Sequence, residues 1–232
     1  MKINSISDIG TIRPDNQDNY WSARLSVNGS ETSILCVCDG MGGLEDGGLA
    51  SKIVVESIRD SILAGTPFNE LKGVLVQANK AIRTLSEGKR MGTTCTVLGC
   101  SEGKYEIYHI GDSRCYLVRE GKMESLTVDH SAIVEYSISK DLNPDLYKKY
   151  KNKLTRCIGL TEEIKVDYIG GDYFEGDIFL VCSDGVWHYF DVNSNYIVNC
   201  DSLQELITLC KQSGERDNMT VITCRVERSE NS

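Results

Sequence analysis

The amino-acid sequence predicts an α+β fold, because helix-like and strand-like segments are segregated along the chain. Two consecutive segments, 49–63 and 68–85, have apolar residues near helical spacing. A run of short strand-like segments follows over 94–126, and turns that each contain a glycine separate them. A further helical signal over 203–210 precedes a last apolar strand at 220–224.

The first two predicted helices are amphipathic, so each is expected to bury one face. In the first, the apolar positions are Ala50, Ile53, Val54, Ile58 and Ile62, and in the second they are Leu71, Val74, Leu75, Ala78, Ile82 and Leu85. The strand-like segments that follow are 94–100, 105–110, 114–119 and 123–126. Because short turns join them, they are expected to form one antiparallel meander.

Bulk composition indicates a small globular protein. The 232 residues are enough for one domain, expected to span 1–232, with one buried core. The net charge of -9 disfavours a nucleic-acid partner, since such proteins usually carry a basic footprint. The ten cysteines lack zinc-site spacing, and no secretory signal is recognisable, so buried reduced thiols are expected. The sequence contains no stretch of about 20 apolar residues, so no membrane-spanning helix is expected. We expect a cytoplasmic monomer.

Aspartates beside glycine or asparagine flank several apolar runs, and they are the most informative feature of the chain. Carboxylates fixed at strand ends can converge, and converging carboxylates repel one another unless cations lie between them. Turn formation alone explains any single Asp-Gly pair. It does not explain the whole set, which comprises Asp39, Asp112, Asp184 and Asp217 together with the early 13–18 segment, Arg-Pro-Asp-Asn-Gln-Asp.

These motifs, in this order, resemble the metal-dependent Ser/Thr protein phosphatases of type 2C, in the compact form typical of bacteria. The resemblance covers nearly the whole chain. The segments that carry it are 8–18, 39–43, 91–94, 111–114, 126–131, 154–159, 183–185 and 217–220. It implies a central antiparallel β-sandwich flanked by helices, in four layers.

The resemblance also implies a reaction, which is direct hydrolysis of phosphoserine or phosphothreonine in proteins. Two Mn²⁺ or Mg²⁺ ions, about 3.5–4 Å apart, would activate a bridging water. By resemblance, Asp39 bridges both ions, Asp184 and Asp217 hold one, and the Gly40 carbonyl helps to hold the other. Asp112 and Asp184 would hold a third, weaker ion, and Asp18 would act through bound waters.

Arg13 is the phosphate clamp by the same resemblance, since a guanidinium offers two parallel donors to phosphate oxygens. Two positions depart from the family. Gln17 replaces a frequent Glu, which could weaken one metal site, and Met41 stands where animal relatives carry a His proposed as general acid. The histidines are expected to be mostly structural, and they are His109, His130 and His188.

The segment at about 130–153 is expected to be a flap beside the active site. Its four lysines within 148–153 suit an acidic or phosphorylated partner, although a solvated surface helix with no partner is the preferred explanation. Expected partners are Ser/Thr-phosphorylated proteins and a cognate Ser/Thr kinase. Two alternatives are a catalytically weak homologue that binds phosphoproteins as a regulatory module, and a two-metal nuclease. The acidic composition disfavours the nuclease.

Overall fold

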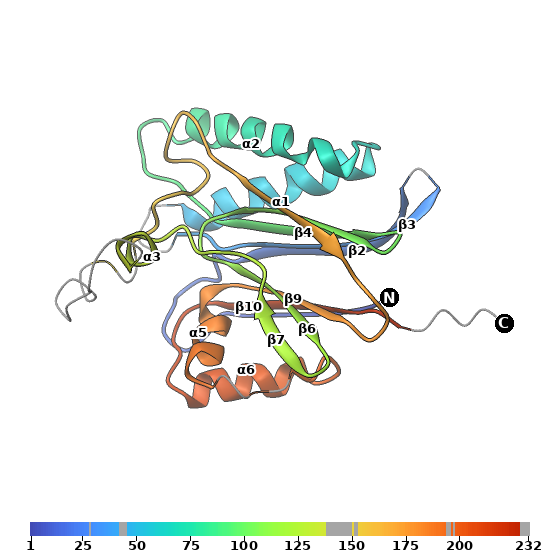
Figure 1. The fold of residues 1–232 in the computed structure, drawn as a ribbon. Helices are drawn as coiled ribbons and strands as arrows, with labels where there is room; N and C mark the ends of the chain where they lie inside the picture. Colours follow the sequence, from blue (N-terminus) through green and yellow to red (C-terminus); the bar gives the residue numbers. More distant parts are fainter. Residues whose placement is uncertain are drawn as a thin grey trace.

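The computed structural model describes residues 1–27, 29–41, 46–137, 150, 153–193, 196 and 198–227. Their fold has four layers, with helices outside and two five-stranded sheets inside (Figure 1). The expectation of an antiparallel β-sandwich flanked by helices is confirmed. None of the described helices is both long and apolar enough to cross a membrane.

Every neighbouring pair of strands in the two sheets is antiparallel. The first sheet has the order β1 (Lys2–Asp8), β10 (Met219–Arg225), β9 (Ile178–Cys182), β6 (Arg114–Arg119) and β7 (Lys122–Ser125). The second has the order β2 (Asn19–Val27), β3 (Ser30–Cys38), β4 (Cys95–Ser101), β5 (Lys104–Ile110) and β8 (Asp167–Asp172).

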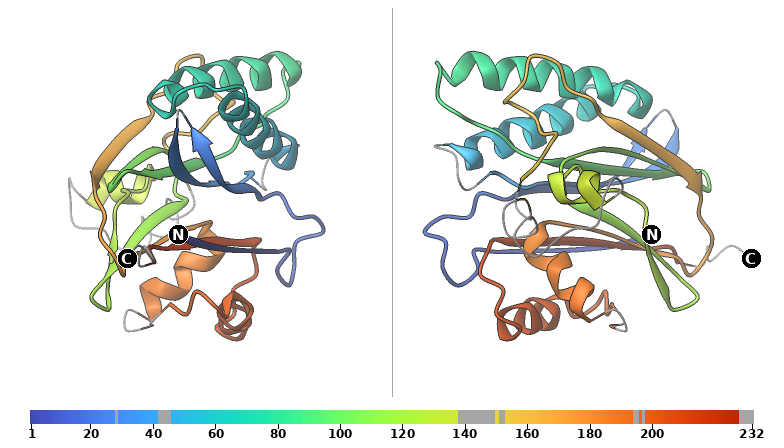
Figure 2. Two further views of the ribbon diagram at one scale, coloured as in Figure 1. Left: turned by 90° about the vertical axis from the view of Figure 1, so that its right-hand side faces the viewer. Right: turned by 60° about the vertical axis from the view of Figure 1, so that its left-hand side comes forward.

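The helices cover the outer faces of the sheets (Figure 2). On the second sheet lie α1 (Gly47–Leu63) and α2 (Leu71–Leu85), which follows the 3₁₀ turn η1 (Phe68–Glu70). On the first sheet lie α5 (Asp184–Val192) and α6 (Leu203–Gln212). The predicted helices 49–63, 68–85 and 203–210 are therefore present, although Leu85, which was expected on an apolar face, is exposed.

Alternation along β3 explains why this strand lies in the centre of the sandwich. Leu35 and Val37 pack between the two sheets. Ile34, Cys36 and Cys38 point the other way and pack against the helices. Because successive side chains of a strand face opposite sides, a strand buried on both faces has a continuous apolar sequence.

The predicted four-strand meander is wrong, because the chain changes sheets after β5. The β4–β5 hairpin belongs to the second sheet, and the β6–β7 hairpin belongs to the first. The link 111–113 looks like a hairpin turn in the sequence. In the structure Gly111 has a φ of 111° and packs against Thr94, where a Cβ would lie 2.5 Å from that side chain. This corner carries Asp112 across the gap between the sheets.

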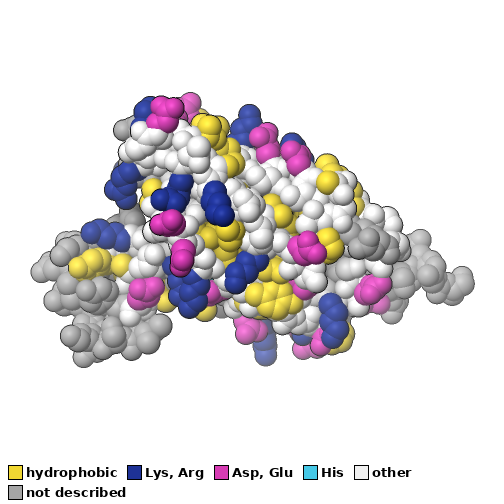
Figure 3. All heavy atoms as spheres, turned by 90° about the horizontal axis from the view of Figure 1, so that it is seen from above, with side chains coloured by type: hydrophobic (Ala, Val, Ile, Leu, Met, Phe, Trp, Pro, Cys, Tyr) yellow, Lys and Arg dark blue, Asp and Glu magenta, His cyan; other side chains and the backbone are white. Residues whose placement is uncertain are grey.

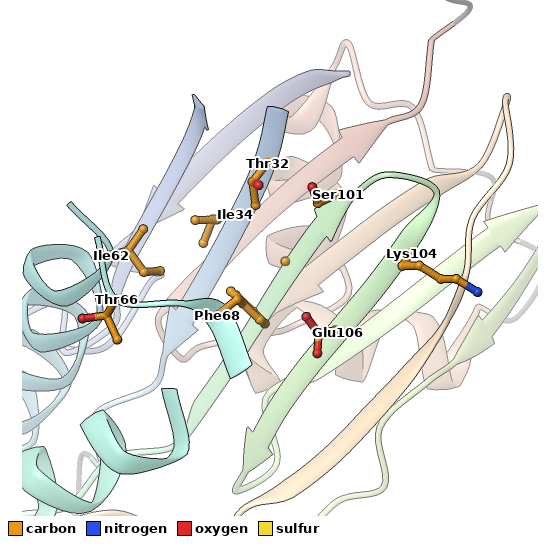
Figure 4. A pocket seen from close by; sticks show the side chains of 9 residues that line it. Thr32, Ile34, Ile62, Thr66, Phe68, Ser101, Lys104 and Glu106 are labelled. Carbon is orange, nitrogen blue, oxygen red and sulfur yellow. The ribbon is translucent and has the colours of Figure 1, made fainter. Parts of the chain in front are cut away.

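Within the segment predicted to be a flap, α3 spans Ala132–Ser137. Residues 138–149 and 151–152, which include three of the four lysines, lie outside the described residues. On the face above α2, basic and acidic side chains are intermixed (Figure 3). A small pocket lies between α1, η1 and the second sheet, where Phe68 covers Gly99 of β4 (Figure 4). It contains none of the predicted site residues.

Candidate metal centre and phosphate site

Five aspartates from separate segments meet where the two sheets end. Asp39 follows β3, Asp184 begins α5 directly after β9, and Asp217 precedes β10. Asp112 lies in the link between β5 and β6, and Asp18 directly precedes β2. The carboxyl of Asp39 interacts electrostatically with the other four, so the structure brings the whole predicted set together.

The backbone around Asp39 is fixed by two threonines of the 91–94 motif. The Asp39 N–H donates to Oγ1 of Thr94 at 2.9 Å, and the Thr94 N–H donates back to the Asp39 carbonyl at 2.9 Å. The Thr93 hydroxyl also donates to this carbonyl, at 2.9 Å. Hydroxyl oxygens of Thr94 and Ser113 lie 2.6 Å apart, which ties the Asp39 turn to the Asp112 corner.

Gly40 is required by close packing as well as by any role for its carbonyl. A Cβ at this position would lie 2.4 Å from the Gly47 carbonyl oxygen and 2.5 Å from that of Gln17. The Gly40 N–H donates to the Gln17 carbonyl at 3.2 Å. The turn therefore packs the start of α1 and the segment before β2 against the Gly40 backbone, next to Asp39.

Asn218 connects the Asp217 loop to the first motif of the chain. Its side-chain amide donates to the carbonyls of Ile9 and Asp15, at 2.9 and 3.1 Å, and its Oδ1 accepts from the Gln17 N–H at 2.9 Å. The side chain is buried. An aspartate at position 218 could not donate either of these two bonds. This explains why an asparagine follows Asp217 in this loop.

Asp184 opens α5, a helix that is absent from the helices predicted by apolar periodicity. The first turn of α5 packs so closely on β10 that a Cβ at Gly185 would lie 2.2 Å from the Asn218 carbonyl oxygen. Ser183 precedes the helix, and its hydroxyl donates to Oδ2 of Asp18 at 2.7 Å. A serine before an acidic first turn was the available signal for this helix.

Arg114 holds α5 against the Asp112 corner. Its guanidinium donates two bonds to Asp129, at 2.9 and 2.8 Å, and two to Asp191 of α5, at 2.8 and 3.3 Å. It also lies 3.5 Å from the ring centroid of Trp187, whose indole N–H donates to the Asp112 carbonyl at 2.7 Å. The charge of Arg114 is thus neutralised by Asp129 and Asp191. We therefore interpret this arginine as a residue that positions α5 beside Asp112.

The aspartates repel one another in the absence of cations. Burial, followed by the negative charge of Asp18, Asp184 and Asp112, raises the pKa of Asp39 well above its usual value. Burial also raises the pKa of Asp112 to about 8, of Asp18 to about 7 and of Asp184 to about 6. Cations placed between these carboxyls would relieve the repulsion.

The donor set fits hard divalent cations. Oδ1 of Asp18 and Oε1 of Gln17 are buried and have no hydrogen-bond partner among the described residues. All candidate ligands are oxygens, which suit Mg²⁺ and Mn²⁺. No three of the described carboxylates bring ligand atoms within 4.8 Å of one another, a spacing that leaves room for waters as ligands.

Arg13 lies at the edge of this cluster, bound to one of its members. Its Nε and Nη2 donate to the two oxygens of Asp217 at 2.7 and 2.5 Å. This ion pair raises the pKa of Arg13, and the more distant Asp184 and Asp39 contribute. The predicted phosphate clamp and a predicted metal ligand therefore bind each other directly, which the sequence did not predict.

The histidines have different surroundings. His109 and His130 are buried, and burial lowers the pKa of both, His109 to about 3. His188 lies on α5, where its Nδ1 is 3.2 Å from Glu215. Burial lowers its pKa, but Glu215, Asp184 and Asp112 together outweigh this effect and raise it.

A cleft of about 770 Å³ runs from the cluster along α5 and α3. It is lined by Asp112, Asp184 and Asp217, and by Ser131, Ile133 and Val134 at the start of the predicted flap. His188 and Glu215 also line it, and neither was a predicted site residue. A phosphorylated side chain that enters this cleft would therefore meet the aspartates at one end.

Comparison with known sequences identifies the family. A model of the protein phosphatase 2C family matches residues 14–220. Protein phosphatase PhpP of Streptococcus pneumoniae is 30% identical over 241 residues, covering 95% of this chain and 96% of that protein. Serine/threonine phosphatase stp of Listeria innocua is 28% identical over 242 residues, covering 96% and 94%.

Solved structures give the same result for the fold. The S. agalactiae serine/threonine phosphatase superposes with a TM-score of 0.80 at 28% identity, covering 97% of this chain and 99% of that one. A bacterial serine phosphatase superposes with a TM-score of 0.86 over 100% of both chains. Its sequence is 24% identical to this chain, so this similarity shows a shared fold and nothing further.

Proposed function

Because the chain belongs to the protein phosphatase 2C family, we propose that it hydrolyses phosphoserine and phosphothreonine esters in proteins, using divalent cations held by its aspartates. The observation that carries the proposal is the convergence of five aspartates beside an arginine, where Asp18, Asp39, Asp112 and Asp184 have raised pKa values. The relatives named as Ser/Thr phosphatases indicate the substrate class. The family is metal-dependent, with Mn²⁺ or Mg²⁺ as its ions.

Each predicted ligand retains its role in this proposal. Asp39 would bridge two ions, Asp184 and Asp217 would hold one, and the Gly40 carbonyl and waters held by Asp18 would serve the other. Asp112 and Asp184 would hold a third ion. The hydrogen bonds from Thr93 and Thr94 support this assignment for Asp39, since they fix its backbone.

When bound, the cations supply Lewis-acid stabilisation and acidify the attacking water. Arg13 would bind two oxygens of the phosphate and orient the phosphorus for in-line attack. To do so, its guanidinium must exchange Asp217 for phosphate, or share both. The cleft walls would direct the phosphorylated side chain toward the aspartates. No cysteine is used, because all ten are buried.

The surroundings of the enzyme follow from the same reasoning. We propose that residues 1–232 act as one monomeric catalytic domain and that the 130–153 segment forms a flap. Ser131, Ile133 and Val134, which line the cleft, support the flap. Ten free thiols suit a reducing compartment, which supports the cytoplasm. Phosphoprotein substrates require a kinase, so a Ser/Thr kinase is the proposed antagonist.

The test is phosphate release from a phosphothreonine peptide, measured after chelation and again after addition of Mn²⁺. We expect turnover only with the metal. Asp39→Asn is the negative control, and Asp60→Asn, an exposed aspartate on α1, is the matched positive control. Full activity in the chelated protein, or a trapped phosphoenzyme, would overturn the proposal. Metal-dependent phosphopeptide binding without turnover would instead favour the regulatory-module alternative, which the intact aspartate set disfavours.

A further inference from the structure

Three thiols form a second cluster of candidate metal ligands, separate from the aspartates. Cys36 and Cys38 lie two residues apart on β3, so their side chains share one face of the sheet. Cys95 begins the neighbouring strand β4. All three residues are completely buried. Among the described residues, only these bring three potential ligand atoms within 4.8 Å of one another.

The spacing of two of the sulfurs matches that of a three-coordinate metal site. Sγ of Cys36 and Sγ of Cys38 lie 4.0 Å apart. Three thiol ligands arranged in a plane, each about 2.3 Å from a central ion, lie about 4.0 Å from one another. Both supporting strands are central in their sheet, because β3 lies between β2 and β4, and β4 between β3 and β5. The third sulfur, Sγ of Cys95, lies within 4.8 Å of the other two.

The surroundings of the cluster favour a monovalent ion. The three thiols face an apolar layer that includes Ile34, Val54 and Ile110. A net charge in such surroundings is costly. One thiolate and two thiols around a single monovalent cation carry no net charge.

We propose that Cys36, Cys38 and Cys95 bind one Cu⁺ ion through three sulfur atoms. Thiol sulfur is the preferred ligand of this ion. Zn²⁺ fits less well, because it takes four ligands in structural protein sites and only three sulfurs converge here. Binding exchanges one thiol proton, released to solvent, for Cu⁺. The copper stays monovalent throughout, so no oxidant or reductant takes part.

The three thiols adjoin, in sequence, the residues that position Asp39. Cys38 is followed by Asp39, and Cys95 follows Thr94, whose backbone and hydroxyl hold Asp39. The alternative is that the three thiols simply fill core space, since cysteine behaves as a small apolar residue. That alternative predicts that they bind copper no more tightly than the other buried thiols, which makes the two explanations separable.

The test is an anaerobic titration of the metal-free protein with Cu⁺, supplied as its acetonitrile complex, against the Cu⁺ chelator bicinchoninate. We expect one ion per chain to withstand the chelator. X-ray absorption at the copper edge should show only sulfur ligands, three of them. Cys36→Ala should weaken binding by more than about 100-fold. Cys100→Ala is the matched control, because Cys100 is a buried thiol on the same strand β4, and it should bind as the wild type does.

Equal Cu⁺ affinity in the two variants would overturn the proposal. So would nitrogen or oxygen ligands in the absorption spectrum, or preferential uptake of Zn²⁺ with a fourth ligand. Circular dichroism checks that each variant folds. If Cys36→Ala does not fold, the ligand count in the wild type decides. The result is independent of the proposed phosphatase activity, since no step of the assay uses a phosphorylated substrate.

Discussion

Asp39 is the residue on which the charges of the site concentrate. It interacts with all four of the other aspartates, and burial together with their charges raises its pKa well above the usual value. Two threonines fix its backbone, so the residue cannot shift as a whole to relieve this repulsion. A bound cation would relieve the repulsion between these carboxylates, and this relief would contribute to its binding affinity.

Asp39→Asn should therefore reduce phosphate release by at least about 10²-fold and raise the melting temperature of the metal-free protein. The amide cannot bridge two cations, and it removes one negative charge from the cluster. Steady-state turnover with Mn²⁺, and thermal unfolding in chelator, measure the two effects. Retention of more than about a tenth of the wild-type rate would contradict the bridging role.

Arg13 presents a different prediction, because it binds Asp217 rather than standing free. Arg13→Ala should raise KM for the phosphopeptide, since a phosphate contact is lost. Affinity for Mn²⁺ should not fall, because the guanidinium occupies both oxygens of a carboxylate that the metal needs. Calorimetric titration measures this affinity. A large loss of Mn²⁺ affinity would mean that Arg13 positions Asp217 for the metal instead of competing with it.

At the scale of elements, the contact between α5 and β10 sets the position of Asp184. Gly185 allows the first turn of α5 to touch the Asn218 backbone, and Asn218 in turn holds the 9–17 segment. Asp184 and Asp217 are thereby placed side by side on neighbouring backbones. The helix also carries Trp187, which Arg114 clamps against the Asp112 corner.

Gly185→Ala should destabilise the fold by about 1–3 kcal/mol, because the new Cβ overlaps backbone that has no room to move. Mn²⁺ affinity should fall as well, since α5 carries Asp184 with it when it shifts. Gly73→Ala is the matched control. Gly73 lies on α2 with nothing within 4 Å of its added Cβ, and the change should stabilise the helix by about 1 kcal/mol. Urea unfolding compares the two variants, and equal stabilities would refute the tight contact.

Across the whole molecule, the aspartate cluster couples stability to pH. In the metal-free folded chain the pKa of Asp112 is about 8, well above the 3.8 of an unperturbed aspartate. Between these values the folded chain holds a proton that the unfolded chain has lost. The free energy of unfolding therefore falls as pH rises through this window.

Asp112→Asn isolates this effect, because an asparagine is neutral at every pH. In chelator, the variant should gain stability relative to the wild type as the pH is raised from about 5 to about 8. The contributions of the buried histidines are common to both proteins and largely cancel in the difference. Thermal unfolding at several pH values measures it. A difference that stays constant, or shrinks, would show that Asp112 is ionised in the metal-free fold.

Sequence reasoning predicted much of this molecule and missed identifiable parts. Apolar periodicity located α1, α2 and α6, because each buries one face. It missed α5, a nine-residue helix whose start resembles a turn. It also placed β5 and β6 in one meander, since periodicity indicates which face is buried and not which sheet receives it. The pairing of Arg13 with Asp217 was not predictable, because it joins residues 204 positions apart.

The aspartates come from both sheets, since Asp18 and Asp39 adjoin β2 and β3 while Asp184 and Asp217 adjoin β9 and β10. An ion shared by Asp39 and Asp184 would therefore cross-link the sandwich. Separating the sheets, which unfolding requires, would take the ligand set apart in the same event. The lifetime of the folded chain would then follow the residence time of its cations, so that chelation accelerates unfolding even where it changes the equilibrium little.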